Sequence, residues 1–175
     1  MQLRQIFAWF DNNNLNTLGD GAERIEIIRI IPFILLHVAC LSVFFVGVSL
    51  VAIAVALLMY VIRMFAITGF YHRYFSHKAF KTSRPIQFLF AFLAASAAQR
   101  GPLWWASHHR HHHANSDKPN DSHSPVQHGF IWSHITWFLV NKNFISKNER
   151  VKDLLVYPEL KFLDRFDVIA PLFLA

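Results

Sequence analysis

The order of apolar and polar segments along the chain predicts its main structural elements. The longest apolar run, residues 30–62, contains no Asp, Glu, Lys or Arg. As a single helix it would be about 50 Å long, whereas the hydrocarbon core of a membrane is about 30 Å thick and requires about 20 residues. One strongly tilted helix is an alternative. Two membrane-spanning helices fit the length better, at residues 32–48 and 50–70, joined by a tight turn near residues 47–49.

Shorter apolar stretches follow this run. Residues 85–98 are too few to span a membrane and predict a re-entrant or core helix. Residues 130–140 predict an interfacial amphipathic helix. Residues 166–175 are expected to be the start of a truncated transmembrane helix. The remaining segments, 1–31 and 71–165, are polar enough to be a cytosolic N-terminal segment and a cytosolic, histidine-rich region.

Composition and charge support this assignment. Hydrophobic residues make up 54% of the chain and charged residues 16%, whereas soluble domains average about 45–50% and about 25%. The predicted fold class is therefore an all-α integral membrane protein. The net charge of +6 could indicate a nucleic-acid partner, but the apolar runs exclude one. Arg4, Arg24 and Arg29 precede the first predicted span and the other basic residues begin at Arg63, which places both groups on the cytoplasmic side.

A run of histidines is the clearest chemical feature of the sequence. Residues 107–113 read Ser-His-His-Arg-His-His-His and hold five of the 11 histidines. Imidazole is a common ligand of zinc, copper and non-haem iron. Residues three and four apart share a helix face, but two sets satisfy that spacing: His109, His112 and His113, or His108, His111 and His112. Spacing alone leaves the ligands open, and an expression tag or a solvated tract remains an alternative to a metal site.

A second histidine pair lies where the second predicted span ends. His72 and His77 are five residues apart, about 140° around an ideal α-helix. They can share a metal only if the helix ends or bends between them, or if they approach it from different directions. Taken alone, the pair favours plain interfacial surface. Cys40 is the single cysteine, so disulfides and thiolate sites are excluded and any metal chemistry rests on nitrogen and oxygen ligands.

Several motifs together resemble those of the membrane-bound fatty acid desaturases, specifically the acyl-CoA, stearoyl-type (Δ9) branch. Residues 68–78, Thr-Gly-Phe-Tyr-His-Arg-Tyr-Phe-Ser-His-Lys, resemble the first histidine box of that family. Residues 105–113 resemble its second box, His-Arg-x-His-His. Asp121-Ser122-His123, Gly129-Phe130 and Ser133-His134 resemble the segment that follows. The similarity covers residues 63–139.

The resemblance implies five metal ligands and leaves His108 and His111 as neighbours; the ligands are His72, His77, His109, His112 and His113. It also implies a cytosolic di-iron centre that uses O2 to introduce a cis double bond into a saturated acyl chain carried by CoA or a membrane lipid. The electrons would come from a donor such as cytochrome b5 or ferredoxin with its reductase. Trp104, Trp105 and residues 85–98 are candidates to line an apolar acyl tunnel, although plain packing in the membrane core explains these aromatic residues more simply.

The sequence departs from the family at two points. The third box of the family, His-x-x-His-His, is not found in these 175 residues, so we expect an incomplete fragment that is inactive by itself. Ser107-His108 stands where animal acyl-CoA enzymes carry Arg-Asp near the CoA head group, which puts the acyl carrier in question. The alternatives are a related histidine-box hydroxylase or a non-catalytic membrane metal-binding protein. A transporter would place ionisable residues inside its spans, and the apolar run holds only His37.

Overall fold

The computed structural model describes residues 10–13, 25 and 27–174, with the side chains of residues 28 and 29 left out. Most of the predicted N-terminal segment 1–31 lies outside these residues. Among the described residues the structure is helical, and its one β-bridge joins Ile25 to Val140. The principal helices are α2 (Ile27–Cys40), α3 (Val43–Val46), α4 (Leu50–Phe65), the π-helix η2 (Ala66–Ser76), α5 (Arg84–Ala95), α6 (Pro102–Asn115), α7 (Pro125–His128), α8 (Phe130–His134), α9 (Pro158–Arg165) and α10 (Ile169–Phe173). The 3-10 segments are Thr136–Leu139, Asn141–Asn143 and Asn148–Arg150.

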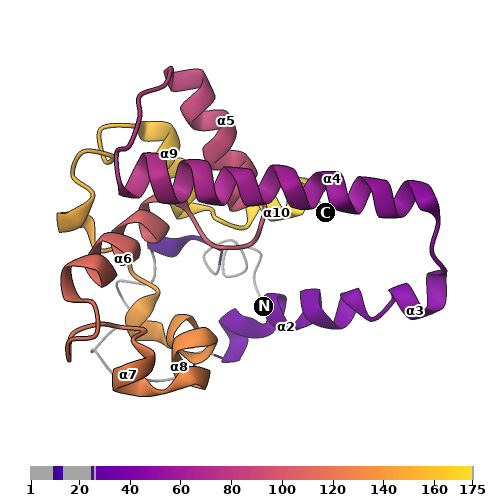
Figure 1. The fold of residues 1–175 in the computed structure, drawn as a ribbon, viewed down its shortest axis with the longest axis horizontal. Helices are drawn as coiled ribbons and strands as arrows, with labels where there is room; N and C mark the ends of the chain where they lie inside the picture. Colours follow the sequence, from indigo (N-terminus) through magenta and orange to yellow (C-terminus); the bar gives the residue numbers. More distant parts are fainter. Residues whose placement is uncertain (1–9, 14–24, 26, 175) are drawn as a thin grey trace, which may run out of the picture.

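The helices α2, α3 and α4 form a long arm that projects from the rest of the molecule (Figure 1). Helix α4 runs without interruption into η2, so that Leu50–Ser76 is 27 residues long. Within the described part of the chain it is the one helix long and apolar enough to cross a membrane. The chain turns before it at Gly47, whose φ of 75° suits glycine, and the Ser49 hydroxyl accepts the Ala52 N–H at 3.1 Å. The predicted turn at residues 47–49 is therefore found.

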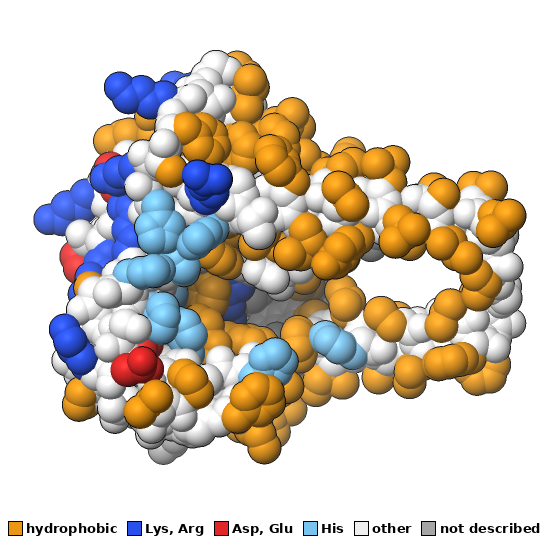
Figure 2. Space-filling view, viewed as in Figure 1, with side chains coloured by type: hydrophobic (Ala, Val, Ile, Leu, Met, Phe, Trp, Pro, Cys, Tyr) orange, Lys and Arg blue, Asp and Glu red, His pale blue; other side chains and the backbone are white. Residues whose placement is uncertain are grey.

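The first predicted span differs from the prediction. The apolar segment there is divided at Leu41 and Ser42 into α2 and α3, and the apolar helix Ile30–Val46 is shorter than a full span. The expectation of two N-terminal spanning helices is thus supported for the second helix only. Apolar side chains line both limbs of the arm on the face shown in Figure 2, and Phe45 and Leu50 are 88% and 85% exposed.

The π-helix η2 explains how a histidine pair with an unfavourable α-helical spacing comes together. In a π-helix each N–H donates to the carbonyl five residues earlier, and the His77 N–H donates to the His72 carbonyl at 3.1 Å. Residues five apart therefore stack on successive turns, instead of lying about 140° apart as in an α-helix. Lys78, with a φ of 54°, ends the helix directly after His77.

Helix α5 (Arg84–Ala95) covers most of residues 85–98, where the sequence predicts a short re-entrant or core helix. Its small residues Ala91, Ala94 and Ala95 are fully buried, which lets it lie close to η2. The Phe70 and Phe90 rings stack across this interface with centroids 4.1 Å apart and planes 5° apart. The loop between η2 and α5 reverses the chain, so the histidines before and after α5 lie on the same side of the molecule.

Two other predicted helices take a different form. Residues 130–140 are divided between α8 and a 3-10 turn, Thr136–Leu139, so no single amphipathic helix forms there. Of residues 166–174, Ile169–Phe173 form the five-residue helix α10, and the start of a spanning helix here stays a prediction. Ala170 is buried, and Phe173 contacts Phe92 of α5 with ring centroids 5.7 Å apart.

Helix α9 closes the N-terminal end of α6. Gly101 is the N-cap of α6, and the Asp164 carboxylate on α9 accepts the Trp104 N–H at 2.7 Å and the Ser146 hydroxyl at 2.8 Å. A carboxylate at a helix N-terminus satisfies an N–H that has no partner within the helix. This contact fixes the end of the helix that carries the histidine run.

Gly101 is required for this contact, so Gly101→Ala is expected to destabilise the fold by roughly 3 kcal/mol. A Cβ at position 101 would overlap the Asp164 Cα and lie 2.5 Å from its Oδ1. Thermal unfolding of the detergent-solubilised protein measures the loss. Gly69→Ala is the control, because a Cβ there lies 3.5 Å from the Phe65 ring, an ordinary contact. Equal unfolding temperatures for the two variants would contradict the close approach of α6 and α9.

The same junction predicts a pH dependence of stability. Burial raises the pKa of Asp164 to about 6, and the hydrogen bonds from Trp104 and Ser146 oppose the shift only in part. The folded state therefore holds this proton more tightly than the unfolded state, whose pKa is near 3.9. The stabilisation is complete below pH 3.9 and is lost as the pH rises through about 6. The free energy of unfolding should therefore fall with pH between pH 4 and pH 7, by at most about 1.4 kcal/mol per pH unit. Asp164→Asn should remove this dependence. Parallel pH profiles for the wild type and the variant would refute it.

Candidate metal centre

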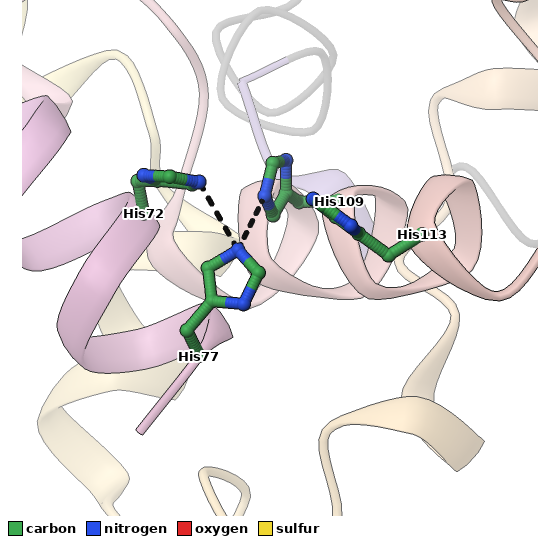
Figure 3. Close-up of side chains that lie close together, drawn as sticks. All are labelled: His72, His77, His109 and His113. Carbon is green, nitrogen blue, oxygen red and sulfur yellow. Dashed lines mark hydrogen bonds between the residues drawn. The ribbon is translucent and has the colours of Figure 1, made fainter. Parts of the chain in front are cut away.

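Four histidines from two helical segments meet at one point. His72 lies in η2, His77 directly follows it, and His109 and His113 lie one turn apart on α6 (Figure 3). One ring nitrogen of each lies within 4.8 Å of the corresponding nitrogen of the others. The His77 Nε2 atom lies 3.0 Å from the His72 Nε2 and 3.1 Å from the His109 Nε2. We call this set the four-histidine cluster.

The geometry of the cluster fits a shared cation. Nitrogen lone pairs that point at one another repel unless a proton or a metal ion lies between them. Two nitrogens at right angles on an ion with metal–nitrogen bonds of about 2.1 Å are about 3.0 Å apart, which matches the separations at His77. A divalent ion held by imidazole nitrogens is therefore compatible with these side chains.

The electrostatics of the cluster favour the neutral imidazoles that metal binding requires. Burial, followed by the charges of the neighbouring histidines, lowers the pKa of His109 to about 3. The same two causes lower the pKa of His77, with burial the larger. Both rings are neutral near pH 7, and their lone pairs are free to bind an ion.

Arg110 ties the two segments of the cluster together. Its guanidinium donates to the carbonyls of Phe75 and Ser76, the two residues before His77. It also donates to the Arg150 carbonyl and to both carboxylate oxygens of Asp153, at 2.7 Å and 3.0 Å. Because Arg110 follows His109 directly, one side chain links the end of η2 to the middle of α6.

An aromatic ring covers one side of the cluster. The Trp105 indole stacks on the His109 imidazole, with centroids 4.8 Å apart and planes 23° apart, and it forms a T-shaped contact with the His72 ring, with centroids 6.3 Å apart. Its Nε1–H donates to the Gln99 side chain at 3.2 Å. Trp105 therefore restricts the His109 ring from one face.

The structure resolves the two helix faces that the histidine spacing left open. His109 and His113 point into the cluster, whereas the His111 Nε2–H donates to the Asn120 carbonyl at 2.8 Å. His108 is buried on the opposite side and donates to the Ile145 carbonyl at 3.1 Å. Neither His108 nor His111 belongs to the four-histidine cluster.

His112, the fifth predicted ligand, lies in a second group. Its Nδ1 atom lies 2.9 Å from both carboxylate oxygens of Asp121. The centroids of the His112 and His123 rings are 4.3 Å apart. Sequence reasoning did not predict Asp121 or Arg110 as parts of the site. The Asp121-Ser122-His123 motif could have indicated that Asp121 belongs to the site. The position of Arg110 inside the histidine run could have indicated the same for Arg110.

The fold and this site define a helical protein in which an apolar, membrane-length helix ends at a nitrogen-rich candidate metal centre. The sequence profile of the family described as fatty acid desaturase matches residues 30–172. The chain belongs to the fatty acid desaturase family. Members of this family use iron, and histidine groups of the kind seen here can bind it.

Individual relatives agree with the family assignment. The chain is 37% identical to an acyl-CoA 5-desaturase of Anemone leveillei over 98 residues, 54% of this chain and 30% of that protein. It is 34% identical to the Delta-9 acyl-lipid desaturase 1 of Arabidopsis thaliana over 146 residues, 82% of this chain and 47% of that protein. It is also 32% identical to an sn-2 palmitoyl-lipid 9-desaturase of Nostoc over 100 residues, 55% of this chain and 35% of that protein. The chain thus spans less than half the length of these relatives.

Proposed function

We propose that the four-histidine cluster and His112 form part of the active centre of an O2-dependent fatty acyl desaturase. The observation that carries the proposal is the four-histidine cluster in a chain of the desaturase family. The reaction would convert a saturated –CH2–CH2– unit, O2, two electrons and two protons into a cis double bond and two waters. Bound iron would supply the oxidant that an unactivated C–H bond requires, since no ordinary acid or base removes such a hydrogen.

In this proposal the protein residues hold and orient the ion. His72, His77, His109 and His113 would hold one iron, and His112 would hold the second iron of a di-iron centre. Arg110 and Trp105 fix the directions of the imidazoles. A second iron held by His112 would need further ligands besides the five histidines named above.

The acyl substrate is carried by CoA or by a membrane lipid, and relatives of both kinds support this class of substrate. Ser107 is fully buried, where its hydroxyl donates to the Trp104 carbonyl and accepts the Lys147 N–H. His108 is buried beside it. We therefore propose that groups other than Ser107 and His108 recognise the acyl carrier. We also propose a Δ9 position for the double bond and cytochrome b5 or ferredoxin as the electron donor.

The proposed topology places residues 32–70 in the membrane as two spans and both histidine segments on the cytoplasmic side. The exposed apolar arm and the helix Leu50–Ser76 support it. Single cysteines at Lys78 and Lys118, introduced after Cys40→Ser, should react with a membrane-impermeant thiol reagent from the same, cytoplasmic side. Labelling of the two positions from opposite sides would contradict the topology.

The experiment that tests the function is a graft. The region of the Arabidopsis Delta-9 acyl-lipid desaturase 1 that aligns with this chain is replaced by the matching residues of this chain. Membranes with iron, the donor and its reductase are then assayed for monounsaturated acyl chains by mass spectrometry. We expect O2-dependent product, which His109→Ala in the graft abolishes. A hydroxylated product would assign the chain to the hydroxylases, and no product from a folded, iron-containing graft would refute the proposal.

The polypeptide of these 175 residues is the second arm of the same experiment. We expect it to bind metal but to yield no product above empty membranes, because the second iron lacks ligands. Turnover by this polypeptide would show that residues such as His123, His128 or His134, or a second copy of the chain, complete the centre.

A further inference from the structure

Asp121 is a fully buried carboxylate next to the four-histidine cluster. Both of its oxygens lie 2.9 Å from the His112 Nδ1 atom. Its Oδ1 also accepts the backbone N–H of His123 at 3.3 Å, and its Oδ2 accepts that of Asp117 at 3.1 Å. Each oxygen thus has a backbone donor in addition to the imidazole, and the carboxylate has no exposed surface.

The loop around Asp121 holds this carboxylate in place. Asp117 has a φ of 57°, an uncommon value outside glycine, and its Oδ1 accepts the hydroxyl of the buried Ser124 at 2.6 Å. Gln127 donates to the Asp117 carbonyl at 2.7 Å, and His128 donates to the Asp121 carbonyl at 3.1 Å. The carboxylate cannot turn away from His112 unless several of these hydrogen bonds break.

Two roles are open to such a group: direct metal binding and orientation of a histidine. His112, Asp121 and His123 are close enough to bind an ion together. The His112 and His123 rings, however, have centroids 4.3 Å apart and planes 35° apart. Lone pairs lie in the ring planes, so those of two rings that face each other do not converge on one ion. With both Asp121 oxygens already occupied by donors, the arrangement favours orientation.

We propose that Asp121 is a positioning residue that keeps the proton of His112 on Nδ1 and thereby presents Nε2 as a free metal donor. Nε2 lies on the ring edge away from the buried carboxylate, and the His112 side chain is 27% exposed. His112 also lines an open pocket of about 290 Å³, together with His123, Pro125, Phe130, Ser133 and His134. Only the identity of the ion as the second iron rests on the proposed function.

A carboxylate that accepts the second imidazole N–H fixes the tautomer and the ring direction of a metal-binding histidine, and its loss typically weakens metal binding about 10- to 100-fold. Asp121 would act on His112 in this way without touching the ion. The neighbouring four-histidine cluster has no such carboxylate among its described hydrogen bonds. Asp121 substitutions should therefore affect the ion at His112 and spare the ion in the four-histidine cluster.

The test uses the full chain in detergent micelles, labelled with ¹⁵N-histidine, near neutral pH. NMR of the metal-free protein should show His112 with its proton on Nδ1, and this measurement needs no substitution at Asp121; a His112→Gln sample assigns the signal. Titration of the graft described above, which supplies the remaining family ligands, with Co²⁺ is followed by absorption and by metal content, and it compares the unsubstituted graft with the Asp121→Asn and His123→Gln grafts. We expect Asp121→Asn to change the His112 tautomer and to weaken the weaker Co²⁺ site about 10- to 100-fold, with His123→Gln close to the wild type.

Other outcomes overturn the proposal. A His112 proton on Nε2 in the wild type would show that Asp121 does not set the tautomer. Loss of one Co²⁺ equivalent in both Asp121→Asn and His123→Gln would make the group a metal site with Asp121 as a ligand. A lower unfolding temperature with an unchanged tautomer and Co²⁺ affinity would leave Asp121 a purely structural role. None of these measurements requires desaturase turnover, so failure of the graft assay and failure of this proposal are distinguishable.

Discussion

His109→Ala is expected to abolish metal binding at the four-histidine cluster. His109 supplies one of the two Nε2 atoms that lie within 3.1 Å of the His77 Nε2, and its ring also contacts that of His113 one turn further along α6. Loss of a direct ligand should weaken binding by more than the roughly 100-fold that loss of an orienting partner costs. Metal content after gel filtration, with iron and separately with zinc, measures the effect. Desaturation by the grafted enzyme should fall to background in parallel.

The control for this experiment lies on the same helix, two residues further on. His111→Ala removes an imidazole of the same run, but one that donates to the Asn120 carbonyl and faces away from the cluster. We expect it to retain metal binding and to lose at most the roughly 1 kcal/mol of stability associated with one hydrogen bond. If His111→Ala loses as much metal as His109→Ala, the assignment of the helix face is wrong.

The sequence predicted the elements whose causes are local. The uncharged run ends at Arg63, and glycine and serine at 47–49 mark the turn before α4. Residues 85–98 were too short to span a membrane and rich in alanine, which matches the buried, close-packed face of α5. Four of the five ligands that the family resemblance implied, His72, His77, His109 and His113, lie together, whereas His112 lies in the second group, and their binding of iron stays a prediction.

What the sequence did not predict depends on contacts between distant segments. A π-helix has no distinctive local pattern, so an α-helix was the natural expectation for His72 and His77. The stable form of this segment depends on its packing against α5 and α6, whose residues come later in the chain. The break between α2 and α3 at Leu41 and Ser42 contains neither Pro nor Gly, so nothing in the local sequence indicated it. The role of Asp121 was equally hidden, because it requires the loop from Asp117 to His128 to bring the carboxylate back onto α6.

Arg110→Gln is expected to uncouple the two halves of the metal centre. Its guanidinium reaches the carbonyls of Phe75 and Ser76, and both of these residues are buried. Without a donor these carbonyls lose their partner in a place that water reaches poorly. Each such group costs about 1–3 kcal/mol, so the fold should lose roughly 3 kcal/mol in chemical or thermal unfolding. The ion pair with Asp153 adds little to this figure, because its carboxylate is 36% exposed.

The consequence for the site is larger than the loss of stability. The hydrogen bonds of Arg110 hold the residues directly before His77, and His77 is the histidine whose Nε2 lies closest to both His72 and His109. If the end of η2 shifts, the His77 nitrogen leaves the common point even though all four imidazoles remain in the chain. We therefore expect a metal affinity at least about 10-fold lower, comparable with the loss of an orienting partner, measured at a temperature well below unfolding.

Two further variants separate the geometry of Arg110 from its charge. Arg110→Lys retains the positive charge, but one ammonium group cannot reach two carbonyls on η2 and both oxygens of Asp153 in the planar arrangement of a guanidinium. It should therefore behave like Arg110→Gln. Arg73→Gln removes an exposed arginine from the same π-helix and should retain both stability and metal affinity. Full metal binding in Arg110→Lys would mean that positive charge near the carboxylate of Asp153 is sufficient, and that the carbonyls of Phe75 and Ser76 do not position His77.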